Sequence, residues 1–142
     1  MAYLRSRQAG EIVNITTGTT GAGTAPSMDP YGLSVLSATS GEVYVLKAPT
    51  MAGQRKTIAF SGNSTANNPV VRLSTATGVV SFFNGATTGL TIMTCAAARS
   101  TASCQVVELI SMNTTSWMIL NVFPCTTTPT AANLGGGVTL SS

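Results

Sequence analysis

The sequence predicts an all-β protein: one domain of eight or nine antiparallel strands, arranged as a β-sandwich, a jelly roll or a barrel-like sheet. Short segments alternate apolar and polar residues with a period of two, and none carries a helical stripe. Turn residues separate these segments at the spacing typical of all-β proteins. Threonine, which is β-branched and favours strands, is abundant. The length of 142 residues suits a single domain with a substantial core.

Residues 42–60 predict a hairpin at the centre of the domain. In its first strand, Tyr44 and Leu46 point to one face and their neighbours to the other. Pro49 ends this strand because proline has no backbone N–H to donate. Gly53 can supply the positive φ of the return turn.

The second strand of this hairpin is residues 55–60, where Lys56 shares a face with Ile58 and Phe60. Its first two residues, Arg55 and Lys56, form either a basic contact patch or a solvated turn. The remaining predicted strands share the period-two alternation and are residues 11–17, 31–37, 70–74, 79–83, 90–95, 104–112 and 117–123.

Three segments make up the predicted domain organisation. Residues 1–30 form an N-terminal arm with a short strand, 31–123 form the β-domain, and 124–142 form a C-terminal arm. Glycine and proline interrupt both arms, which lack a sustained hydrophobic pattern. Val138 and Leu140 are the apolar anchors expected in the second arm.

The composition of the chain indicates which partners and which compartment to expect. Charged residues make up 8% of the chain, and the net charge of +3 comes from scattered basic residues, so we expect no nucleic-acid partner. No apolar run reaches the roughly 18 residues that span a bilayer, so we expect no membrane partner. The N-terminal arginines precede no apolar segment of a secretory signal, which favours a reduced compartment for the three cysteines. Pairing of Cys95 with Cys104 across a hairpin is left open.

The residue types for catalysis are missing or dispersed. Histidine is absent, and the four acidic residues fall in four different predicted elements. Three cysteines without a C-x-x-C spacing do not make a zinc site. We therefore expect no catalytic residues, no metal, no cofactor and no small-molecule substrate. Trp117 lies in a strand that is apolar on both faces, which favours a core or subunit-interface role over a stacking platform.

Two segments resemble a pattern found in small structural proteins of tailed bacteriophages. They are residues 43–60, VYVLKAPTMAGQRKTIAF, and residues 106–120, VVELISMNTTSWMIL. The pattern is a hairpin that carries Leu, Ala-Pro, Gly and Lys-Thr-Ile in this order, then a V-E-L turn and a strand that begins with Trp. The matching residues are Leu46, Ala48, Pro49, Gly53, Lys56, Thr57, Ile58, Val107, Glu108, Leu109 and Trp117. On these residues the chain resembles the capsid decoration, or cement, proteins.

The resemblance implies a homotrimeric virion protein, made in the host cytoplasm, that binds the outer capsid surface and bridges neighbouring major capsid subunits. The arms would lie along those subunits, with the arginines meeting acidic surface. The expected capsid contacts are Tyr3, Leu4, Arg5, Arg7, Arg55 and Lys56. The residues expected in the core or the oligomer interface are Trp117, Ile119 and Phe123. The alternative function is a tail-fibre or head-fibre domain that recognises host glycans.

Overall fold

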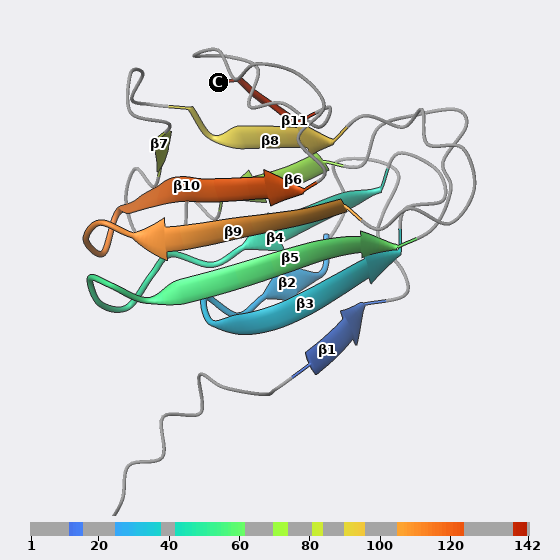
Figure 1. Ribbon diagram of the computed structural model, residues 1–142, viewed down its shortest axis with the longest axis horizontal. Coiled ribbons are helices and arrows are strands. Elements are labelled where there is room, and N and C mark those ends of the chain that lie inside the picture. Colours follow the sequence, from blue (N-terminus) through green and yellow to red (C-terminus); the bar gives the residue numbers. More distant parts are fainter. Residues whose placement is uncertain are drawn as a thin grey trace, which may run out of the picture.

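A computed structural model describes residues 12–15, 25–37, 42–61, 70–73, 81–83, 90–95, 105–123 and 138–141, and these contain strands and connections but no helix (Figure 1). The strands are β1 (Ile12–Ile15), β2 (Ser27–Met28), β3 (Gly32–Ser37), β4 (Val43–Leu46), β5 (Arg55–Ser61), β6 (Val70–Leu73), β7 (Ser81–Phe83), β8 (Ile92–Cys95), β9 (Gln105–Ser111), β10 (Ser116–Phe123) and β11 (Val138–Ser141). The predicted all-β class is confirmed.

The strands form two open sheets of mixed direction. Sheet A has the order β1-β3-β5-β9-β10-β7, and sheet B has the order β11-β8-β6-β4-β2 (Figure 1). One hydrophobic cluster draws on both sheets. Sheet A contributes Leu36, Ile58, Phe60, Val107, Leu109, Trp117 and Val122, and sheet B and its edge contribute Met28, Tyr44, Leu46, Val71, Met93 and Leu140.

Strands β1 to β6 alternate between the sheets. The odd-numbered three pair in parallel in sheet A, and the even-numbered three pair in parallel in sheet B. The predicted hairpin over residues 42–60 is therefore wrong: β4 pairs with β2 and β6, whereas β5 pairs with β3 and β9. Residues 47–54 connect β4 of sheet B to β5 of sheet A.

The prediction of antiparallel strands fails for the same reason. Among the described strands, five of the nine pairings are parallel. A period-two pattern shows which side chains of a strand share a face. The pattern is the same whether the next strand of the chain lies in the same sheet or in the opposite sheet. The residues predicted to share a face do so: Tyr44 and Leu46 are both buried in sheet B, and Ile58 and Phe60 are both buried in sheet A.

The predicted strands 104–112 and 117–123 are present as β9 and β10 and form a hairpin. Strands β9 and β10 are antiparallel neighbours, with an irregularity in register between Ile119 and Asn121. The Asn113 side chain shapes their connection, because its Oδ1 accepts hydrogen bonds from Thr115 N at 2.7 Å and from Ser116 Oγ at 3.0 Å. On β9, Val107, Leu109 and Ser111 face the core and are buried.

The sheets extend beyond the predicted domain bounds of 31–123. Strands β1 and β2 fall in the predicted N-terminal arm 1–30, and β11 falls in the predicted C-terminal arm 124–142. Met28 is 1% exposed and Leu140 is 5% exposed, so both segments supply core residues. Residues 25–30 of the first arm are also described, whereas residues 1–11, 16–24, 124–137 and 142 of the two predicted arms lie outside the described part.

We predict a large contrast between two substitutions to alanine. Leu46→Ala removes a side chain at 0% exposure between the two sheets and should lower the free energy of unfolding by about 2 to 5 kcal/mol. Met51→Ala, at 56% exposure, should change it by no more than about 0.5 kcal/mol. Urea unfolding followed by tryptophan fluorescence measures both. Equal effects would show that β4 does not face a shared core.

Candidate interaction surfaces

The outer face of sheet A is a described surface that exposes large apolar side chains. Strand alternation sends one set of side chains away from the core, and no described strand lies in front of this sheet (Figure 1). We call this set the outer face: Leu33, Val35, Arg55, Thr57, Ala59, Val106, Glu108, Ile110, Met118, Leu120, Asn121 and Phe123. Leu120 and Phe123 are 42% and 55% exposed, which marks the face as a candidate binding surface.

The strand register arranges the outer face in rows. Val35 is opposite Ala59, Ala59 is opposite Val106, and Val106 is opposite Phe123. This row is apolar across four strands, and cross-strand neighbours of this kind are in direct contact. A second row runs from Arg55 to Ile110 and Met118.

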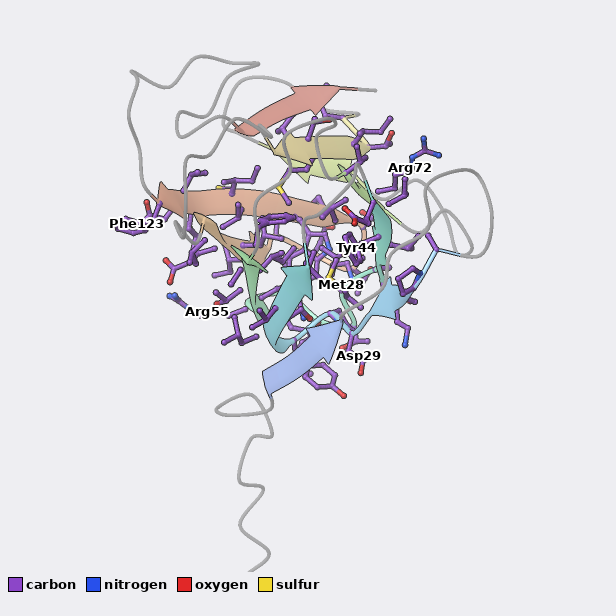
Figure 2. All side chains as sticks on the ribbon, turned by 90° about the vertical axis from the view of Figure 1, so that its right-hand side faces the viewer. Met28, Asp29, Tyr44, Arg55, Arg72 and Phe123 are labelled. Atoms are coloured by element: carbon purple, nitrogen blue, oxygen red, sulfur yellow. The ribbon has the colours of Figure 1, made fainter. Side chains whose placement is uncertain are left out.

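The residues predicted for the core or interface separate into two groups. Trp117 is fully buried, and Ile119 packs against the core cluster. Phe123 is exposed on the outer face, where Figure 2 shows it on the same side of the molecule as Arg55. The Trp117 indole Nε1 has no hydrogen-bond partner among the described residues. Trp117 is therefore a core residue, and Phe123 is the one available for contacts.

The predicted basic patch also separates. Arg55 is exposed, but Lys56 is 1% exposed, so in this structure it is not a surface contact residue. The reason is the alternation that the sequence already shows, which places Lys56 on the inward face with Ile58. The other predicted contacts, Tyr3, Leu4, Arg5 and Arg7, lie outside the described residues, as does Cys104.

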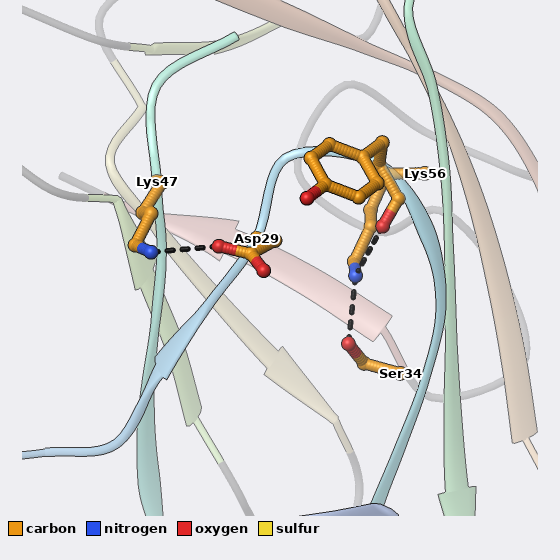
Figure 3. Close-up of polar contacts among 5 residues, drawn as sticks. Asp29, Ser34, Lys47 and Lys56 are labelled. Atoms are coloured by element: carbon orange, nitrogen blue, oxygen red, sulfur yellow. Dashed lines mark hydrogen bonds and ion pairs between the residues drawn. The ribbon is translucent and has the colours of Figure 1, made fainter. Parts of the chain in front are cut away.

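Buried Lys56 is held by sheet A itself. Its Nζ donates hydrogen bonds to Ser34 Oγ at 2.7 Å and to the Tyr31 carbonyl oxygen at 3.0 Å (Figure 3). Burial lowers the pKa of Lys56 to about 8, and the nearby charge of Asp29 acts in the opposite direction. Asp29 itself pairs with Lys47 at 2.7 Å in a half-exposed ion pair. Lys56 thus ties the start of β5 to the start of β3.

A second candidate surface lies at one end of the molecule. Three connections gather there, residues 29–31, 47–54 and 112–115, and we call this the crossover end (Figure 1). Gly53, with the predicted positive φ at 79°, donates its N–H to the Ser111 carbonyl oxygen at 2.8 Å. The Ser111 N–H donates in turn to the Gln54 carbonyl oxygen at 2.9 Å.

The Ser111 hydroxyl completes this attachment. Ser111 Oγ accepts the Gln54 N–H at 2.8 Å and donates to the Met51 carbonyl oxygen at 2.6 Å. Met51 and Met112 are 56% and 49% exposed on the two connected segments. Sequence analysis missed these two residues, because an exposed methionine in a turn has no distinguishing pattern. The crossover end therefore exposes two apolar side chains, and hydrogen bonds join the two segments that carry them.

Potential metal ligands are dispersed in the part of the chain that the structure describes. No three His, Cys, Asp or Glu side chains there are placed to hold a metal ion. No helix long and apolar enough to cross a membrane occurs in the same residues. A comparison of the sequence with protein-family models and with curated proteins finds no match.

We predict that the protein gains stability as the pH rises from 8 to 10. Lys56 has a pKa of about 8 in the folded protein against 10.5 for an ordinary lysine, so in this window the unfolded chain binds more protons. Tyr44 acts in the opposite direction only above pH 10, because burial and the charge of Glu42 raise its pKa to about 12.

Urea midpoints at pH 8, 9 and 10 measure this dependence, and Lys56→Met is the comparison. The variant has no titrating group at this position, so its midpoint should rise less than that of the unchanged protein. A variant with the same pH dependence as the unchanged protein would show that Lys56 is not desolvated.

Proposed function

We propose that this chain is a capsid decoration protein of a tailed bacteriophage. It binds the outer surface of the head, bridges major capsid subunits and stabilises the shell, and it acts by binding without catalysis or a cofactor. The proposal rests on the resemblance carried by residues 43–60 and 106–120. Those residues lie on β4, β5, β9, β10 and their connections, so what they share with the family is a framework.

The observation that carries the proposal is the edge position of the first described strand, β1. Strand β1 is the edge strand of sheet A, and residues 1–11 precede it. A segment that begins at a sheet edge can extend to a neighbouring subunit and add to that subunit's sheet. This segment contains Tyr3, Leu4, Arg5 and Arg7, which supply an apolar and a cationic element for an acidic capsid surface.

The proposed assembly is a homotrimer of two-sheet sandwiches. The single core drawn from both sheets supports a sandwich, since inward side chains of two packed sheets interdigitate. Three identical copies would give three arms per particle. Weak contacts by each arm then combine into strong binding, because attachment of the first arm raises the effective concentration of the others.

The glycan-binding alternative has less support. It needs exposed aromatic rings beside polar groups, and two of the four Trp and Tyr side chains, Trp117 and Tyr44, are fully buried. Tyr31 is partly exposed, and Tyr3 lies outside the described residues. A specific hit on an array of bacterial surface glycans would favour this alternative over the capsid.

Deleting residues 1–10 tests the proposal. The truncated protein should keep its circular dichroism spectrum and its oligomeric state, because the deletion ends before β1. Its binding to purified shells of the encoding phage should fall at least tenfold, because each copy loses its arm. Cosedimentation with shells measures binding, and the full chain carrying Arg72→Ala, which removes one cation from sheet B, is the control. Undiminished binding of the truncated protein would contradict the proposal.

A further inference from the structure

The outer face of sheet A carries one cation and one anion, Arg55 and Glu108. In the described part of the chain the ion pair is between Lys47 and Asp29, and it does not involve either of these residues. Lys56, the neighbour of Arg55, is inside and bonded to Ser34. The outer face therefore offers two opposite charges that the described residues leave without an ion-pair partner.

The register places these charges close together among apolar residues. Arg55 is opposite Ile110 and Thr57 is opposite Glu108 on the antiparallel strands β5 and β9, so the two charges are diagonal neighbours. The apolar row that ends in Phe123 lies on one side of Glu108, and Ile110 lies on the other. A partner that covered this face would remove both charges from water.

Charge complementarity identifies which partner can do so. A covering surface must bring an anion to Arg55 and a cation to Glu108, because a charge left unpaired in an interface is strongly unfavourable. It must also bring apolar side chains to Phe123 and Leu120, which are 55% and 42% exposed. A second copy of the outer face supplies all three elements at once.

We propose that the outer face of sheet A is the contact between copies of this chain, with Arg55 of one copy against Glu108 of the next. Phe123 and Leu120 fill the apolar part of the contact. This inference rests on the self-association in the proposed function and assigns the surface that makes it. Around a threefold axis, each copy gives Arg55 to one neighbour and Glu108 to the other, so the contact closes.

Charge reversal of the full-length protein tests the contact, with light scattering after size exclusion as the readout. Arg55→Glu and Glu108→Arg each place like charges together and should raise the dissociation constant of the oligomer at least tenfold. The double variant restores opposite charges and should recover the unchanged mass. Arg72→Glu is the matched control: it makes the same reversal at an exposed arginine on the opposite side of the molecule (Figure 2) and should leave the mass unchanged.

A second pair of variants tests the apolar part. Phe123→Ser should dissociate the oligomer, whereas Met51→Ser, at a side chain of equal exposure on the crossover end, should not. Urea unfolding of each variant shows whether the fold is intact. A substitution that acted only within one chain would change the stability and leave the mass of the oligomer unaltered.

The inference is overturned if the unchanged protein is a monomer at all concentrations. It is also overturned if both single reversals keep the full mass, or if Arg72→Glu dissociates the oligomer equally. The proposed function has a separate readout, binding to shells. If the charge-reversal variants keep the full mass and the unchanged protein binds shells, only the contact is refuted. If the charge-reversal variants dissociate as expected and the unchanged protein does not bind shells, only the capsid role is refuted.

Discussion

The structure depends on one constraint: two sheets share a single hydrophobic core, so the inward side of each strand must be covered by the opposite sheet. Strands β1 to β6 satisfy it by alternating between the sheets. Tyr44 and Leu46 on β4 meet the same cluster as Ile58 and Phe60 on β5, although the two strands belong to different sheets. Their connections therefore cross at an end of the molecule, where the crossover end forms.

Burial of Lys56 follows from the same constraint. Its position on β5 alternates inward, and the structure accommodates the amine by pointing Nζ at Ser34 and at the Tyr31 carbonyl. A buried amine with two acceptors favours one register of β3 against β5, since a shift by one residue would turn Lys56 outward and remove both partners. The same desolvation lowers its pKa, which links the packing of sheet A to pH.

Much of the inward and outward pattern could be predicted from the sequence, because alternation is a local property. The division of β4 and β5 into two faces, the strands that became β9 and β10, and the choice of a core or interface position for Trp117 were predictable. Strand pairing was not, because residues 47–54 are as compatible with a crossover as with a turn. Strand β2 has two residues, and Pro26 and Pro30 flank it, so its core residue Met28 shows no pattern. Strand β11 was expected only as the anchors Val138 and Leu140, because glycines precede it.

The candidate surfaces depend on which side of a strand each residue occupies. Adjacent residues Arg55 and Lys56 look like one basic patch in the sequence, but alternation makes one a surface charge and the other an internal one. The outer face becomes visible only when the register aligns Val35, Ala59 and Val106 with Phe123 across four strands. Long-range pairing therefore creates the surface that the proposed assembly uses.

The central claim is the alternation of consecutive strands between two sheets, and interstrand nuclear Overhauser effects test it most directly. The account predicts backbone contacts between Val45 and Arg72 and between Val35 and Ala59, in parallel register. It predicts no ladder of backbone contacts between β4 and β5. An antiparallel ladder joining residues 43–46 to residues 55–60 would contradict the account and restore a hairpin.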